Sequence, residues 1–209
     1  MPNLLLDLDE VLVTTISSTN FEETIVVLQP FLNKFLSVFD GEIFVLTHRC
    51  RYEASQIVDL YPELSARVKR IVAAEDLAVF SIQYGKILDL FRKGVQKSYV
   101  CDYLKSNGFD IQSFIFIDDN INNLNLLSSC GCGACFCFPR PNFIDNHIVT
   151  FDIKNLCNYQ IDKNVNSVIY LVSDVKYFLS SCKNHSVKKN MCYSYSRKML
   201  KFIRLLLFN

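Results

Sequence analysis

Short apolar runs alternate with longer segments of mixed polarity through the first two thirds of the chain. The runs have the length and the β-branched, leucine and aromatic content of buried strands. They fall at residues 3–6, 42–46, 114–117 and 134–138, and residues 68–72, which include two basic residues, form a fifth candidate strand. Strands that alternate with helical segments predict an α/β, Rossmann-like fold, in which a mostly parallel central sheet has helices on both faces.

The segments between these runs have the spacing and end signals of helices. We predict helices at residues 30–39, 51–60, 81–91, 97–107 and 122–129. Pro30 occupies a favoured first-turn position, and Gly108 is a typical helix stop. The polar segment 10–20 is predicted to be a loop, and residues 23–28 a short strand.

Acidic residues follow two of the predicted strands. Asp7 and Asp9 end the first run, and Asp118 with Asp119 ends the run at 114–117. Ligands of parallel α/β sheets bind beyond the carboxyl ends of the strands, so these residues are expected to converge there. Crowded carboxylates need a cation or a shared proton, and hard cations such as Mg²⁺ take carboxylate oxygens. The pattern therefore predicts a divalent-cation site.

Four elements in this order resemble the motifs of the haloacid dehalogenase (HAD) superfamily, specifically its aspartate-nucleophile phosphatases. They are Asp7-Leu8-Asp9-Glu10-Val11, Phe44-Val45-Leu46-Thr47, Lys97, and Asp118-Asp119 with Asn120 and Asn123. The resemblance covers roughly residues 1–140. Residues 28–36 are also similar to the helix entry of the small protein phosphatases that act on the polymerase tail.

The resemblance implies a role for each matching residue. Asp7 would be the nucleophile that forms an acyl-phosphate, and Asp9 would protonate the leaving alcohol and then activate water. Thr47 would bind a phosphoryl oxygen through its hydroxyl and its backbone amide. Lys97 would neutralise the nucleophile and the phosphate, and Lys93 is the alternative lysine.

The metal and the substrate are also assigned by resemblance. Asp118 and Asp119 would hold Mg²⁺ together with Asp7 and the backbone carbonyl of Asp9, and which member of the acidic pair coordinates directly is left open. Asn120 and Asn123 are expected to cap the following helix. Substrate contacts are assigned to His48 and Arg49, beside Thr47, with a solvated loop as the alternative.

The spacing of the motifs points to an open site without a large cap domain. The intervals 10–46 and 48–96 are filled by ordinary predicted elements. An open site accepts a phosphorylated side chain, so we expect a phosphoprotein substrate, with phosphotyrosine and phosphoserine/threonine both open. The alternatives are a small-metabolite phosphatase and an inactive phosphoprotein-binding scaffold.

Charge divides the chain unevenly. The 209 residues are 50% hydrophobic and 21% charged with a net charge of +1, as expected for a globular protein. Residues 183–209 hold seven basic and no acidic residues, so we separate a phosphatase domain at 1–182 from a basic, amphipathic segment at 183–209. This segment is a candidate for peripheral membrane or partner contact. No nucleic-acid partner is expected, and the oligomeric state is open.

Nine cysteines without a recognisable leader favour the cytoplasm or another reducing compartment, which leaves open delivery to another cell by a non-classical route. No apolar run is long enough to span a membrane. Cys130, Cys132, Cys135 and Cys137 form a cluster. Their spacing is not that of paired zinc knuckles, so we expect core packing over a zinc site.

Overall fold

The main body of the protein is built on a seven-stranded parallel sheet. The computed structural model describes residues 2–17, 23–28, 39–138, 149–152, 160–161, 169–173 and 185–188. The strand order is β5-β4-β1-β6-β7-β9-β8, and each neighbouring pair is parallel. The strands are β1 (Asn3–Asp7), β4 (Ile43–Leu46), β5 (Val68–Val72), β6 (Phe114–Asp118), β7 (Ala134–Cys137), β8 (Val149–Asp152) and β9 (Ile169–Ser173).

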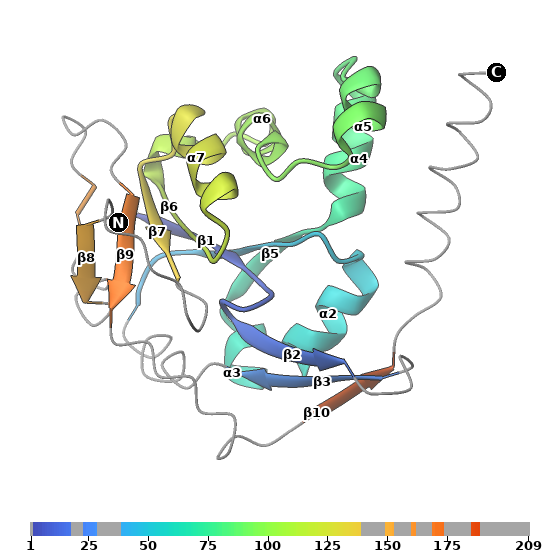
Figure 1. Ribbon diagram of the computed structural model, residues 1–209, viewed down its shortest axis with the longest axis vertical. Coiled ribbons are helices and arrows are strands. Elements are labelled where there is room, and N and C mark those ends of the chain that lie inside the picture. The colour runs from blue at the N-terminus through green and yellow to red at the C-terminus, as the bar shows by residue number, and fades with distance from the viewer. Residues whose placement is uncertain are drawn as a thin grey trace.

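Helices cover both faces of this sheet (Figure 1). Helices α2 and α3 lie on one side, and α4 to α7 lie on the other. Their bounds are α2 Arg51–Asp59, α3 Pro62–Ser65, α4 Ala74–Gln83, α5 Ile87–Lys93, α6 Tyr99–Ser106 and α7 Ile121–Ser129, and a 3-10 turn spans Ile111–Ser113. The predicted fold class is therefore confirmed at the level of layers and strand direction.

Alternation along the strands sends side chains into two separate cores. In β1, Leu4 and Leu6 pack in the cluster that contains Ile57 of α2. Leu5 packs in the opposite cluster, which contains Leu104 of α6 and Leu124 of α7. Both faces of β1 are buried, and this explains why the strand reads as an unbroken apolar run.

Two predicted elements differ from the structure. The helix expected at 81–91 is wrong in its bounds, because α4 already begins at Ala74 and a break separates it from α5. Gly85 in that break has a φ of +71°, which belongs to the left-handed region that ends helices. The segment 10–20 is not all loop, since it contains strand β2 (Val13–Ser17).

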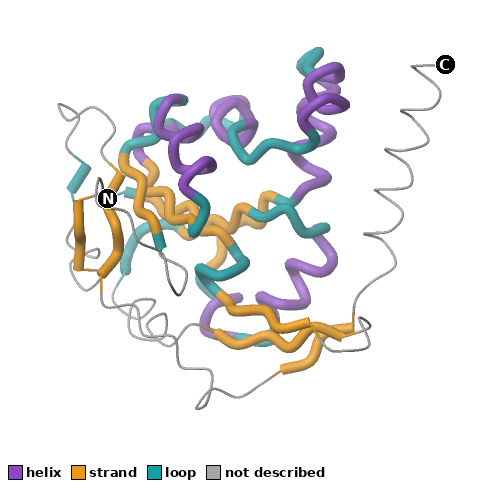
Figure 2. The backbone as a smooth tube through the Cα atoms, viewed as in Figure 1, coloured by secondary structure: helices purple, strands orange, loops and turns teal. Residues whose placement is uncertain are grey.

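A second, three-stranded antiparallel sheet follows the first strand of the main sheet. Strand β2 pairs with β3 (Glu23–Leu28), and β3 pairs with β10 (His185–Lys188). Figure 2 shows these strands apart from the main sheet, on the side of α2 and α3. Strand β3 was expected from the sequence, whereas its partner from the C-terminal part of the chain was not.

Strands β8 and β9 were also not predicted, although both extend the main sheet. The helix expected at 30–39 falls outside the described residues, except for Phe39, and so does the basic segment 183–209 apart from residues 185–188. Within the described parts of the chain, every helix is too short or too polar to cross a bilayer.

Candidate active site

The predicted site residues meet at one edge of the main sheet. Asp7 is the last residue of β1 and Asp118 the last of β6, and Thr47 comes directly after β4. Strand β1 lies between β4 and β6, so three neighbouring strands end at the same place. The parallel register thus brings together side chains that are far apart in the sequence.

A buried lysine joins two of these carboxylates. The Nζ atom of Lys97 lies 2.6 Å from Oδ2 of Asp7 and 2.8 Å from Oδ2 of Asp118. All three residues are buried. Burial alone lowers the pKa of Lys97, but the two carboxylates outweigh this effect, so the pKa lies above its ordinary value.

The alternative lysine has different surroundings. The side chain of Lys93 is 64% exposed at the end of α5, and its Nζ atom lies 3.6 Å from Asp89 one helical turn away. Gly94, with a φ of +75°, then redirects the chain toward Lys97. Of the two lysines, Lys97 is the one that contacts Asp7 and Asp118.

Three carboxylates are close enough to share one cation. Within the described residues, Asp7, Asp118 and Asp119 form the one group of potential metal ligands, with oxygen atoms within 4.8 Å of one another. Burial, countered by Lys97 and reinforced by Asp118 and Asp9, raises the pKa of Asp7 to about 8. Three buried carboxylates beside a single ammonium retain excess negative charge, and an oxygen-only donor set suits Mg²⁺. These residues therefore fit the ion implied by the motifs.

The loop after β6 is arranged around Asp118. Its Oδ1 atom accepts hydrogen bonds from the Asn120 amide (2.7 Å) and from Nδ2 of Asn123 (3.2 Å). Asn120 caps α7 by accepting from the Asn122 amide, as expected. The side chain of Asn123 instead bonds to the Asp118 carboxylate, so the expectation that it caps the helix is wrong.

Thr47 is fully buried beside this cluster. It was predicted to bind a phosphoryl oxygen through its hydroxyl and its backbone amide, and only the hydroxyl is available for this. Its backbone amide donates to the carbonyl oxygen of Val72 at 3.0 Å, so we omit that amide from phosphate binding. Its Oγ1 atom accepts from the amide of Arg49 at 3.0 Å. With an N–H as its donor, the hydroxyl can direct its own proton toward another acceptor.

Arg49 contacts acidic residues of the protein itself. Its Nε atom lies 3.0 Å from both oxygens of Asp9, its Nη2 lies 2.7 Å from Oδ1, and its Nη1 donates to Glu53. Burial lowers the pKa of Arg49, but the carboxylates of Asp9 and Glu53 raise it by more. The pKa of Arg49 therefore lies above its ordinary value. Glu53 was missed in the sequence, although its position four residues after Arg49 is the spacing of a helical ion pair.

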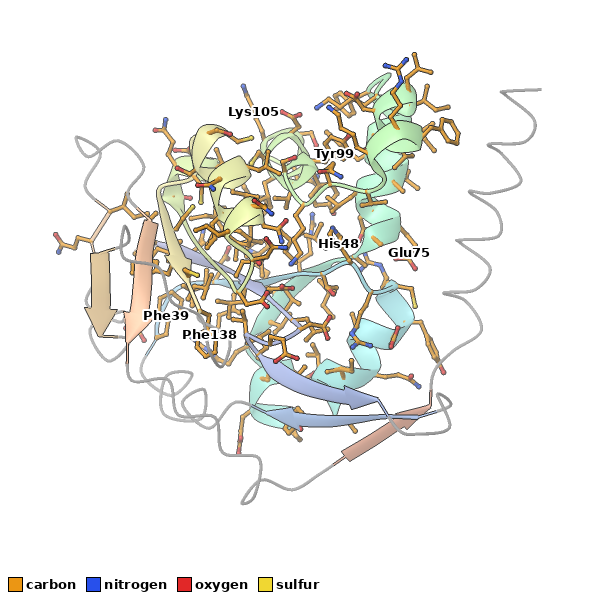
Figure 3. The ribbon with its side chains drawn as sticks, in the orientation of Figure 1. Phe39, His48, Glu75, Tyr99, Lys105 and Phe138 are labelled. Atoms are coloured by element: carbon orange, nitrogen blue, oxygen red, sulfur yellow. The ribbon has the colours of Figure 1, made fainter. Side chains whose placement is uncertain are left out.

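His48 is exposed in the loop between Thr47 and Arg49 (Figure 3). Although part of the residue is exposed, the protein around its ring and then the Lys97 cation lower its pKa, which favours a neutral ring. A neutral imidazole can donate or accept a hydrogen bond at the rim of the site.

The cysteine cluster packs in the core. Cys132, Cys135 and Cys137 are buried in the same apolar cluster as α6 and α7, and Cys130 is exposed. The Sγ atom of Cys132 lies 3.4 Å from the carbonyl oxygen of Phe114. In the described part of the chain, the group of potential metal ligands is formed by aspartates and does not include these cysteines.

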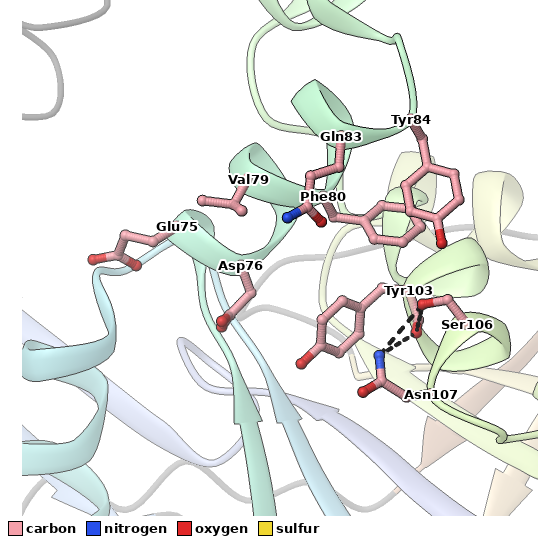
Figure 4. Close-up of a pocket in the computed structure, with 9 residues that line it drawn as sticks. All are labelled: Glu75, Asp76, Val79, Phe80, Gln83, Tyr84, Tyr103, Ser106 and Asn107. Atoms are coloured by element: carbon pink, nitrogen blue, oxygen red, sulfur yellow. Dashed lines mark hydrogen bonds between the residues drawn. The ribbon is translucent and has the colours of Figure 1, made fainter.

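A pocket of about 330 Å³ lies between α4 and α6 (Figure 4). Phe80, Tyr84 and Tyr103 form its aromatic wall, and Glu75 and Asp76 lie at one end. The predicted site residues are not among those that line it. The candidate active site is therefore the carboxyl edge of the sheet and not this pocket.

Comparison with known proteins identifies the architecture. No family model and no curated protein sequence matches the chain. A protein from Thermotoga maritima described as a beta-phosphoglucomutase superposes with a TM-score of 0.53 at 8% identity, over 82% of this chain and 94% of that one. The chain shares the α/β, Rossmann-like fold of that structure. At 8% identity this likeness concerns the fold alone.

Two further solved structures have lower TM-scores. A HAD family hydrolase from Streptomyces avermitilis gives a TM-score of 0.46 at 8% identity, over 68% of this chain and 74% of that one. The 3-deoxy-D-manno-octulosonate 8-phosphate phosphatase from Moraxella catarrhalis, solved with magnesium and phosphate ions, gives 0.45 at 12% identity, over 83% and 76%.

Proposed function

We propose that the protein is a Mg²⁺-dependent HAD phosphatase that hydrolyses phosphomonoesters of protein side chains. The observation that carries the proposal is the buried group of Asp7, Lys97 and Asp118 at the end of neighbouring strands, with Asp119 beside it. A nucleophilic carboxylate, a fixed cation and a carboxylate set for a metal are the parts that attack on a phosphate ester requires.

Asp7 is the proposed nucleophile. One of its oxygens attacks phosphorus, the bond from phosphorus to the ester oxygen breaks, and an aspartyl-phosphate forms on Asp7. Lys97, held against the same carboxylate, offsets the negative charge that gathers there. Mg²⁺, when held by Asp7, Asp118 and Asp119, would supply further positive charge against the phosphoryl oxygens.

Asp9 and Thr47 would complete the reaction. Asp9 gives a proton to the departing alkoxide or phenoxide, and later takes one from the water that attacks the aspartyl-phosphate. Oγ1 of Thr47 accepts a hydrogen bond from the amide of Arg49, so its own proton is available. The hydroxyl of Thr47 donates this proton in a hydrogen bond to a phosphoryl oxygen. The products are a free hydroxyl side chain, inorganic phosphate and the regenerated Asp7 carboxylate.

A protein substrate is supported by the accessibility of the rim. The side chain of Asp9 is 35% exposed, and His48 is exposed beside it. Within the described residues, the interval from Thr47 to Lys97 is taken up by α2 to α5 and β5, which belong to the layers of the main domain. A phosphorylated side chain on a macromolecule can approach such a rim.

A small-metabolite phosphatase is the second candidate, and one observation favours it. Strand β2 begins four residues after Asp9 and belongs to the sheet that β10 completes. A sheet so near Asp9 could form one wall of a binding site for a small substrate.

The proposed function is tested with a generic aryl phosphate and a panel of phosphopeptides and metabolites. Asp7→Asn removes the nucleophile with little change in volume, so turnover should be abolished while the circular dichroism spectrum is kept. Asp89→Asn, at an exposed surface pair, is the matched control and should retain turnover. Hydrolysis by Asp7→Asn at the wild-type rate would refute the nucleophile, and preference for one metabolite would favour the second candidate.

A further inference from the structure

The rim of the site contains a chain of three charged side chains that the proposed chemistry uses only in part. The guanidinium of Arg49 lies between two carboxylates, with Asp9 on one edge and Glu53 on the other. Asp9 is the most exposed member, with 35% of its side chain accessible, while the side chains of Arg49 and Glu53 are 16% and 8% exposed. Arg49 is therefore held by the buried Glu53 at one edge of its guanidinium and paired with the more exposed Asp9 at the other.

Glu53 sets the orientation of Arg49. It lies in the first turn of α2, its carboxylate is buried, and it accepts from Nη1. The amide of Arg49 is fixed as well, through its bond to Thr47. Because both the backbone and one edge of the guanidinium are fixed, the edge formed by Nε and Nη2 faces Asp9 in a fork that matches any carboxylate.

The pairing conflicts with the role proposed for Asp9. Nε and Nη2 of Arg49 contact both oxygens of the Asp9 carboxylate, which is then an acceptor on both sides. A residue that protonates a leaving group must instead direct an oxygen and its proton toward the ester. Asp9 therefore has to exchange partners before the first chemical step, and the Arg49 fork must then find another anion or stay unpaired.

We propose that Arg49 is a specificity-determining residue that exchanges Asp9 for an acidic side chain of the substrate, next to the phosphorylated residue. The inference rests on the proposed function and narrows its substrate class to acidic phosphopeptides. On the fork one carboxylate replaces another while Glu53 continues to hold Arg49, and the released Asp9 takes up from water the proton that it then gives to the leaving oxygen. A neutral substrate offers no replacement, so release of Asp9 from Arg49 costs a charge-assisted contact.

The test uses two phosphopeptides that differ only at the residues flanking the phosphorylated one, with Glu in one and Gln in the other. We compare kcat/KM for wild type, Arg49→Gln and Arg51→Gln. Arg51 is the matched control, because it is also an arginine at the start of α2 but pairs with Asp76, away from the site. Equilibrium binding of both peptides to Asp7→Asn forms of the same proteins gives a readout that does not require turnover.

Wild type should prefer the acidic peptide by about tenfold, the scale of one charge-assisted contact. Arg49→Gln should reduce this ratio to about one and raise kcat/KM on the neutral peptide by about threefold, because Asp9 is no longer held by a partly exposed ion pair. Arg51→Gln should keep the wild-type ratio. Arg49→Lys, which retains the charge but not the fork, should keep only part of the preference.

Three results would overturn the inference. One is a wild-type protein without preference for the acidic peptide, in turnover or in binding. Another is a preference that survives in folded Arg49→Gln, and the third is slower turnover of the neutral peptide by that variant, which would make Arg49 a positioning residue for Asp9. If no phosphoester is hydrolysed by any form, the proposed function fails, and the binding ratio still decides the role of Arg49.

Discussion

Replacement of Lys97 by methionine tests the electrostatics of the site through stability. Methionine keeps most of the side-chain volume and removes the ammonium that lies 2.6 Å from Asp7 and 2.8 Å from Asp118. Both carboxylates are buried, with side-chain exposures of 8% and 0%, so neither can regain full hydration. Loss of one partner from a buried ion pair costs about 3–5 kcal/mol.

Protonation of Asp7 limits that cost. Its pKa is raised to about 8 by burial and neighbouring charge, so Asp7 is already mostly neutral at pH 7 and does not become a second unpaired charge when the lysine is removed. We therefore expect Lys97→Met to lose about 3 kcal/mol of stability, at the lower end of that range. This loss corresponds to a fall in Tm of about 6–12 °C for a chain of this length.

The assay is thermal unfolding followed by circular dichroism, without metal and with excess Mg²⁺. The control is Lys93→Met, because Lys93 is 64% exposed and its pair with Asp89 should contribute under about 0.5 kcal/mol. Mg²⁺ should restore more stability to Lys97→Met than to wild type, since it replaces the missing positive charge. Equal losses of Tm in the two variants, or no added effect of Mg²⁺ on Lys97→Met, would refute this reasoning.

Three further predictions follow from the site and the tail. Asp9→Asn should lose more kcat on phenyl phosphate than on an activated nitrophenyl phosphate, because protonation matters most for poor leaving groups, and equal losses would contradict its acid role. The raised pKa of Asp7 leaves it protonated below about pH 8, so Mg²⁺ must displace a proton from it at lower pH. Calorimetry should therefore show the affinity for Mg²⁺ rising by up to about tenfold per pH unit toward pH 8 and then levelling. An affinity that does not change with pH would exclude Asp7 as a ligand. Removal of residues 197–209 should leave aryl-phosphate turnover nearly unchanged and weaken binding to anionic vesicles, whereas loss of folding would make that segment structural.

The sheet edge was predictable because local signals and topology agree there. Asp7 and Asp118 each follow a run that is buried on both faces, and parallel strands place such ends together. The helix α6 and its stop at Gly108, with a φ of +82°, were likewise visible in the sequence. These elements depend on local propensity and on one repeated pattern.

Other features depend on distant pairing, which a single sequence does not reveal. Strand β10 is four residues long, and its partner among the described strands is β3, more than 150 residues earlier in the chain. The partners of Arg49 were missed because nothing in the sequence links it to Asp9, which lies 40 residues away in the segment after β1, or to Glu53 in α2. The use of the Thr47 amide by Val72 is a contact between neighbouring strands that the motif does not specify.

The central claim is that Asp7 carries the phosphoryl group, and mass spectrometry of the quenched enzyme tests it most directly. Wild type mixed with Mg²⁺ and an aryl phosphate is quenched in acid, reduced with borohydride and digested. The account predicts that the peptide containing Asp7 carries homoserine in place of the aspartate, through reduction of the acyl-phosphate. Asp9→Asn, which should slow breakdown of the intermediate, should increase that product. Steady turnover with unmodified Asp7, or with the modification on another residue, would contradict the account.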